Sequence, residues 1–228
     1  DRTSIVEDVV KDGSLATYTA VPPQFATGPD GSDFSEDQTM FQDVCSDDPA
    51  KAAEYLEAAK AELGQDTFTF QLLVEDTTES QNVAAVIKEQ VETNLPGVTM
   101  EIKVEPKKQR VEDIQEGNYE VCLTRWGPDY ADPMTYLNMW ITDNNNNYGK
   151  WSNAEYDAII ADCTTGQYVS DASARWQALY DAEKIIMDEA VIVPVYTKAD
   201  ACMIKSNVTG VDFHPVALNR VFKNATKG

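Results

Sequence analysis

The sequence predicts an α/β fold in which a layered sheet is flanked by helices. Between residues 68 and 123, segments with a hydrophobic period of two alternate with segments of helical period. The chain has 228 residues, of which 43% are apolar, so it is long enough to bury a core. Strands that alternate with helices favour parallel neighbours within one sheet.

Three stretches differ in composition. Residues 1–45 are rich in Gly, Pro, Ser and Asp and show little periodicity beyond a short start around Ile5–Val10, so we expect an extended, turn-rich arm. Residues 46–206 carry the alternating pattern and form the predicted α/β lobe. After Lys205 the pattern fades, which predicts a C-terminal tail over residues 207–228.

The lobe begins with a predicted amphipathic helix. Asp48 can cap it, Pro49 suits the first helical position, and Gly64 ends it. A β-α-β-α-β series follows. Its strands are expected at 68–72, 98–104 and 119–123, and its helices at 83–91 and 111–114.

Further helices are expected at 134–140, at 156–163, and from the capping candidates Ser170 and Asp171 to Ala190. The apolar run Val191–Tyr196 predicts a buried strand despite Pro194, placed at an edge or a bulge.

The charge balance excludes some partners. With 18 Lys and Arg against 39 Asp and Glu, the formal charge is −21, which disfavours nucleic acid. The acidity indicates a solvated surface that would attract cationic groups. No stretch approaches the roughly 20 apolar residues of a membrane helix. Because the chain begins Asp1-Arg2-Thr3 without Met, we expect that it was cut from a longer protein.

Cofactor chemistry has little support. Cys45, Cys122, Cys163 and Cys202 lack C-x-x-C spacing, and His214 is a lone histidine, so we expect neither a metal nor a cofactor. The cysteines could form two disulfides or act as four buried thiols. In an oxidising compartment, we predict that at least one pair is oxidised.

The most unusual segment is Arg125–Pro133, RWGPDYADP, which follows a predicted strand. Ligands of α/β folds tend to lie beyond the carboxyl ends of strands. Asp129 and Asp132 could form an acid and base pair as in a glycosidase. Alternatively, Asp132 caps the next helix with Pro133 in its first turn, which leaves Asp129 without a second acid.

Here the sequence resembles the solute-binding proteins of oligopeptide, dipeptide and nickel ABC transporters. Tyr119–Leu137 is similar to their segment of a strand, G/R-W-x-x-D-Y-x-D/E-P and a helix. Other similarities follow in the family's order. They are Asp1-Arg2 with Pro22-Pro23, the helix start Asp48-Pro49-Ala50-Lys51-Ala52, the connection from Asn147-Tyr148 to Trp151-Ser152-Asn153-Ala154-Glu155-Tyr156-Asp157, and the strand Ile192-Val193-Pro194-Val195-Tyr196.

The resemblance implies the C-terminal, ligand-binding lobe of a two-lobed protein with a periplasmic-binding-protein-like fold. It implies an extracytoplasmic setting, anchoring to the membrane through the missing N-terminal part, a permease partner and a peptide ligand. The tail at 207–228 could contact the absent N-terminal lobe. A non-peptide ligand, such as a sugar or a nickel chelate, is the main alternative, and a carboxylate-dependent hydrolase is a further one.

The resemblance also implies roles for single residues. Asp129 matches the acid that receives a peptide α-ammonium, an interaction that favours a charge-assisted acceptor. Trp126 could wall the ligand cleft with its aromatic face. Tyr130 is a further candidate, and the planar fork of Arg125 suits a ligand carboxylate. We expect these four residues to form the ligand site and expect no catalytic residue.

Overall fold

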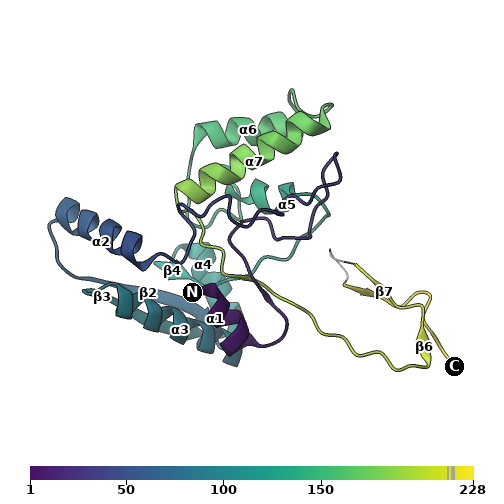
Figure 1. The fold of residues 1–228 in the computed structure, drawn as a ribbon, viewed down its shortest axis with the longest axis horizontal. Coiled ribbons are helices and arrows are strands. Elements are labelled where there is room, and N and C mark those ends of the chain that lie inside the picture. The colour runs from purple at the N-terminus through teal and green to yellow at the C-terminus, as the bar shows by residue number, and fades with distance from the viewer. Residues whose placement is uncertain (215, 217–218) are drawn as a thin grey trace. The chain divides into compact units, whose positions relative to one another are not determined.

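The computed structural model describes residues 1–214, 216 and 219–228 (Figure 1). The chain divides into two compact units. The first comprises Asp1–Ala16 and Ser46–Arg125, and the second comprises Thr17–Cys45 and Trp126–Gly228. The division at residues 45 and 206 that composition suggests therefore stays a prediction, while the α/β class is confirmed.

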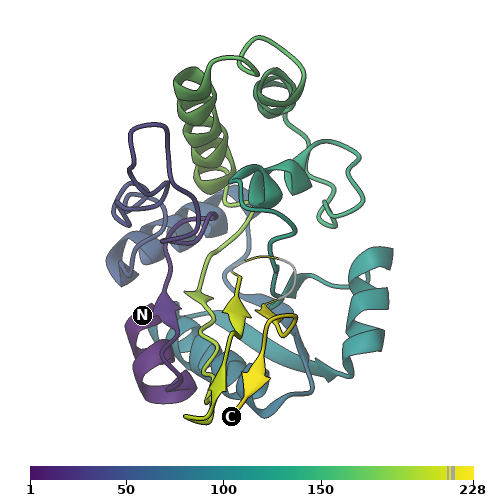
Figure 2. The ribbon, with the colours of Figure 1, turned by 90° about the vertical axis from the view of Figure 1, so that its right-hand side faces the viewer.

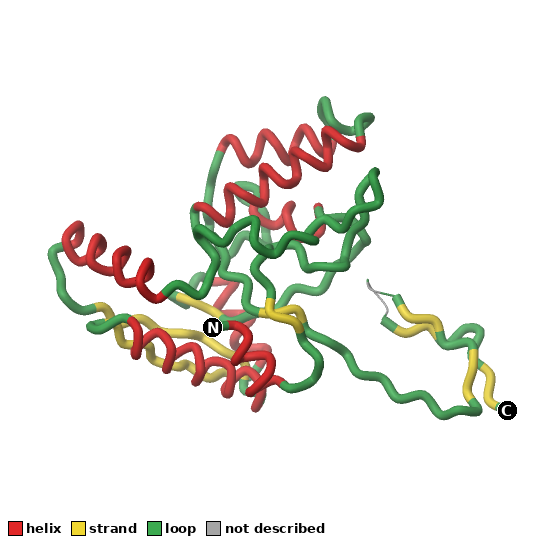
Figure 3. Tube along the Cα trace, in the orientation of Figure 1, coloured by secondary structure: helices red, strands yellow, loops and turns green. Residues whose placement is uncertain are grey.

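The first unit is built on a parallel sheet. Its strands are β2 (Phe68–Glu75), β3 (Val98–Glu105) and β4 (Val121–Cys122), in the order β3-β2-β4. The register of β2 and β3 runs from Phe68 opposite Val98 to Glu75 opposite Glu105. All three strands were expected, although β4 is shorter than its pattern suggests. Figure 3 shows these strands beside the helices of the unit.

Two helices connect these strands. Helix α3 (Thr78–Asn94) begins at Thr77, whose side chain accepts from Ser80 N, and helix α4 (Lys107–Glu116) ends at Gly117. The apolar face of α3 packs on the sheet because its residues recur at helical spacing. The resulting core cluster contains Leu72, Val74, Ala84 and Met100.

Helix α2 (Pro49–Leu63) has the ends that the sequence predicts. Asp48 Oδ1 accepts from Lys51 N at 3.0 Å, and Gly64 takes the left-handed φ of 65° that closes the last turn. All of its residues are described and none is buried. The unit also contains α1 (Arg2–Ser4), the π-helix η1 (Ile5–Val10) and β1 (Leu15–Ala16).

The second unit packs helices on an irregular chain. Its helical elements are α5 (Met134–Leu137), the 3-10 helix η2 (Asn138–Trp140), α6 (Ala154–Thr164) and α7 (Ala172–Asp188). Residues 17–45 contain no named helix or strand, yet Val21, Phe34 and Phe41 are buried in the same core. The Phe34 ring stacks on Tyr180 with centroids 4.2 Å apart. Turns separate these apolar residues, so no period in the sequence reveals their burial.

The predicted buried strand at Val191–Tyr196 is wrong in most of its length. Only Tyr196–Thr197 forms a strand, β5, and Val193 is 68% exposed. The run begins as the closing turn of α7, because Val191 N donates to Ile186 O at 3.0 Å. Pro194 then offers no backbone N–H to a neighbouring strand.

The tail is more ordered than its sequence suggests. Strand β6 (Val208–Thr209) pairs with β9 (Thr226–Lys227), and β7 (Asp212–Phe213) pairs with β8 (Arg220–Val221), both antiparallel. Figure 2 shows these short strands in yellow near the C-terminus. Met203, Phe213 and Phe222 are exposed.

The expected oxidised cysteine pair is absent. All four cysteines lie in the described part of the chain, and Cys122, Cys163 and Cys202 are free thiols. Cys122 belongs to β4 in the first unit, whereas Cys163 is buried in α6. Burial raises the pKa of both thiols, which makes them less reactive.

Candidate ligand-binding site

The loop at residues 126–132, defined here as the acidic loop, is folded against the first turn of α5. Trp126 Nε1 donates to Thr135 O, and Asp129 N donates to Thr135 Oγ1, both at 3.0 Å. Thr135 is only 2% exposed, so both bonds end on a buried residue. One threonine therefore holds two points of the loop.

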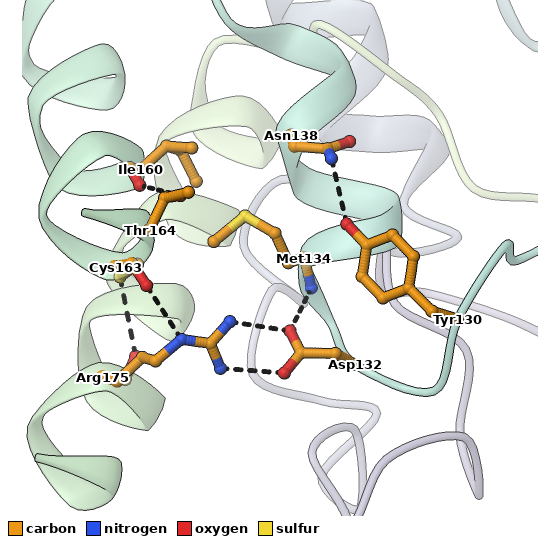
Figure 4. A network of polar contacts seen from close by, with 8 residues as sticks. All are labelled: Tyr130, Asp132, Met134, Asn138, Ile160, Cys163, Thr164 and Arg175. Carbon is orange, nitrogen blue, oxygen red and sulfur yellow. Dashed lines mark hydrogen bonds and ion pairs between the residues drawn. The ribbon is translucent and has the colours of Figure 1, made fainter. Parts of the chain in front are cut away.

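Asp132 anchors the end of the acidic loop (Figure 4). Its Oδ1 accepts from Met134 N, the first residue of α5, at 2.9 Å. The N-cap of α5 is Pro133 and not Asp132 as the sequence suggested, because the helix begins one residue later than expected. The same carboxylate forms a bidentate ion pair with Arg175 of α7, with both N–O distances at 2.9 Å. Both carboxylate oxygens are thus engaged, and the ion pair raises the pKa of the Arg175 guanidinium.

Tyr130 lies on the same loop and keeps an exposed ring. Asn138 Nδ2 donates to the Tyr130 hydroxyl oxygen at 3.0 Å, and the residue is 41% exposed. Burial of part of the side chain raises the pKa of the Tyr130 hydroxyl, and the charges of Asp132 and Asp129 raise it further. The hydroxyl therefore stays protonated near neutral pH.

Asp129 is the unpaired acid of the acidic loop. Its side chain is exposed, and within the described residues no hydrogen bond or ion pair engages its carboxylate. Trp126, at 36% exposure, and Tyr130 offer aromatic surface on the same loop. A loop that exposes both a carboxylate and aromatic side chains suits an organic cation, because both kinds of group attract positive charge.

Arg125 differs from the other three candidates. It is the last residue of the first unit, and its side chain is 54% exposed. Its NH1 lies 3.9 Å from Glu79 Oε1, a long and partly solvated ion pair. The structure thus places Trp126, Asp129 and Tyr130 in one loop, and Arg125 with Glu79.

The contacts of Asp132 weaken the paired-acid hypothesis. A glycosidase needs two carboxyl groups that can exchange protons with the substrate. Asp132 is committed to Arg175 and Met134 N, whereas Asp129 is the carboxylate left open. Among the described residues, no group of three or more His, Cys, Asp or Glu side chains could hold a metal ion.

Sequence reasoning missed Thr135 and Arg175. Thr135 lies within the predicted helix, but nothing in the pattern shows that its hydroxyl contacts the acidic loop. Arg175 is 43 residues from Asp132 in the sequence and resembles any charged residue on a helix. Their part in the site follows from tertiary structure alone.

The fold and the acidic loop define the class of this chain as an α/β lobe of the binding-protein type. The chain belongs to the bacterial extracellular solute-binding proteins, family 5, whose middle region matches residues 1–148. No helix among the described residues has the length and apolar character needed to cross a membrane.

Several known proteins resemble the chain. A dipeptide-binding protein of Lactococcus lactis is 30% identical over 226 residues, which are 99% of this chain and 40% of the relative. The substrate-binding domain of an oligopeptide ABC transporter from Bacillus anthracis gives a TM-score of 0.89 at 37% identity, covering 100% of this chain and 43% of that one. Listeria monocytogenes OppA bound to peptide gives 0.86 at 27%, with coverage of 100% and 42%. The chain therefore spans about two fifths of these proteins.

Proposed function

We propose that this chain is the ligand-binding lobe of a two-lobed, extracytoplasmic protein that captures peptides and delivers them to an ABC permease. The observation that carries the proposal is the open carboxylate of Asp129 on a loop whose backbone is fixed by Thr135. The peptide-binding names of the relatives support the ligand class.

In this proposal, Asp129 receives the α-ammonium of the peptide. An ammonium that is enclosed by protein loses its water and needs a charge-assisted acceptor. Trp126 and Tyr130 expose aromatic surface on the same loop and would contact the ligand there. Arg125 would bind a ligand carboxylate in place of its long contact with Glu79. The chain itself then has no catalytic step.

We further propose that a second lobe, outside this chain, closes over the ligand. The exposed apolar side chains Met203, Phe213 and Phe222 support an interface of the tail at 207–228 and the stretch before it with that lobe. Anchoring to the membrane through the N-terminal part of the protein is a further element of this proposal, which fits the extracellular family.

The test compares the affinities of two peptides for the two-lobed protein. Asp129→Ala should cost about 2–5 kcal/mol of binding free energy for a free-amine peptide, because the partner charge is left buried and unpaired. The N-acetylated form of the same peptide should bind both variants almost equally. Isothermal titration calorimetry measures both. Asp188→Asn, which removes an exposed acid from α7, is the control for net charge.

An equal loss for both peptides would show that Asp129 is structural. Retained binding of a sugar or a nickel chelate, with no binding of peptides, would favour the non-peptide alternative. The hydrolase alternative is tested by turnover of peptide and glycoside libraries, followed by mass spectrometry. We expect saturable, unmodified retention, and sustained release of cleaved product would contradict the proposal.

A further inference from the structure

We propose that Arg175 is a positioning residue for amine recognition: it holds Asp132 so that the acidic loop presents Asp129 to the ligand. The inference rests on the proposed function and adds a residue on a distant helix. Arg175 itself contacts no ligand in this scheme. Its effect is transmitted through the carboxylate of Asp132.

The ion pair between Arg175 and Asp132 fixes the orientation of the carboxylate as well as its distance from the guanidinium. NH1 and NH2 of Arg175 each donate to a different oxygen of Asp132, both at 2.9 Å (Figure 4). Two parallel bonds set the plane of the carboxylate, which a single bond cannot do. Both side chains are partly shielded from solvent, with 24% and 32% exposed, so water competes less than at a fully exposed pair.

Arg175 is itself fixed by a third element. Its Nε donates to Cys163 O at 3.0 Å. Cys163 lies in the last turn of α6, where backbone carbonyls lack partners within the helix and carry partial negative charge. One guanidinium thus joins the end of α6, the first turns of α7 and the end of the acidic loop. A lysine at this position keeps the charge but loses the rigid fork.

Backbone bonds connect Asp132 to the residue that meets the ligand. Asp132 N donates to Tyr130 O, and Thr135 N donates to Asp132 O, both at 3.0 Å. Thr135 in turn accepts from Asp129 N through Oγ1. A shift of Asp132 would therefore move both Tyr130 and the threonine that holds Asp129.

The ion pair also separates the roles of the two acids. Because Arg175 offsets the charge of Asp132, Asp129 is left as the unpaired anion of the loop. Without Arg175, two uncompensated carboxylates three residues apart would compete for the same ammonium. The acidic loop would then attract the ammonium, but neither carboxylate alone would fix its position.

The experiment uses the two-lobed protein with a matched pair of free-amine and N-acetylated peptides. Arg175→Lys and Arg175→Gln should lower affinity for the free-amine peptide by roughly 3- to 30-fold. Affinity for the acetylated peptide should change little, so the ratio between the two shrinks. The control is Lys184→Gln, which removes a cation from the same helix. Among the described ion pairs, Lys184 pairs only with Asp188, so its loss should leave the ratio unchanged.

A double-mutant cycle tests whether Arg175 and Asp132 act through one contact. Asp132→Asn should reproduce the loss, and combining it with Arg175→Gln should add little, because both changes break one contact. Circular dichroism measures whether each variant is folded. If Arg175→Gln does not fold, the comparison of the two peptides uses Arg175→Lys. Folded Arg175 variants that weaken both peptides equally, or neither, would overturn the inference.

The two proposals fail in different ways. If Asp129→Ala shows no amine-specific loss, the proposed role of Asp129 fails whatever Arg175 does. If Asp129→Ala shows that loss while folded Arg175→Lys and Arg175→Gln keep the wild-type ratio, only the positioning role is wrong.

Discussion

At the residue scale, Glu183 is the most unusual side chain of the core. It lies in α7 with no exposed surface, and its Oε1 accepts from Val21 N at 2.8 Å. Its Oε2 has no hydrogen-bond partner among the described residues. Burial raises the pKa of Glu183 to about 7, although backbone bonds from Val21 and Ala20 oppose the shift.

This shift predicts that stability falls as pH rises. Below pH 4.5, the ordinary value, Glu183 is protonated in both the folded and the unfolded chain. Between pH 4.5 and about 7 the unfolded chain releases the proton while the folded chain keeps it, so folding loses free energy. The full penalty, on the order of 3 kcal/mol, is reached above the folded pKa.

Urea unfolding of wild type and Glu183→Gln at pH 4.5 and 7.5 measures this penalty. Gln keeps an oxygen acceptor for Val21 N and cannot ionise, so its stability relative to wild type should increase with pH. Other acids, such as Asp113 with its lowered pKa, contribute equally to both proteins and cancel in the difference. A difference that does not change with pH would mean that Glu183 ionises freely.

The residue scale also shows what the sequence could predict of the site. Trp126, Asp129 and Tyr130 are predicted as ligand residues because they lie close together in one segment that resembles the family's pattern, and their role stays a prediction. The contacts of Arg175 and Glu183 could not be predicted, because each side chain meets a residue far away in the sequence, at 43 and 162 positions. A helix pattern shows that a residue is polar, but not which distant group it meets.

At the element scale, several helix ends could be predicted from the sequence. Asp48, Gly64 and Asp171 stand where the caps were expected, because capping depends on neighbours within four residues. Elements whose structure depends on residues distant in the sequence were harder to predict. The run Val191–Tyr196 has strand-forming residues but becomes a helix terminus and an extended segment. Residues 17–45 lack any period, yet they help to form the core of the second unit.

Helix α2 offers a test of local stability, since none of its residues is buried. Asp48→Ala removes the cap bond to Lys51 N and should destabilise the helix by about 0.5–2 kcal/mol. Amide hydrogen exchange within α2 should accelerate accordingly, with little change in α3. Asp48→Ser retains a capping oxygen and should restore slow exchange. Equal exchange in the Ala and Ser variants would show that the cap does not hold this helix.

At the scale of the whole molecule, each compact unit has its own hydrophobic cluster. The chain should therefore fold cooperatively by itself, without the second lobe that we propose. Tight ligand binding, unlike folding, should need the second lobe, because the Asp129 carboxylate is exposed in this chain. An ion pair in water contributes only about 0–1 kcal/mol, whereas enclosure between two lobes excludes water and strengthens it.

Calorimetry of a free-amine peptide with this chain alone and with the two-lobed protein tests that claim most directly. We expect the isolated chain to be folded and to bind weakly or undetectably, and the two-lobed protein to bind tightly. Circular dichroism and urea unfolding establish that the isolated chain is folded in the same samples. Full affinity in the isolated chain, or no binding by the two-lobed protein to any free-amine peptide, would contradict the account of a lobe that captures peptides by closure.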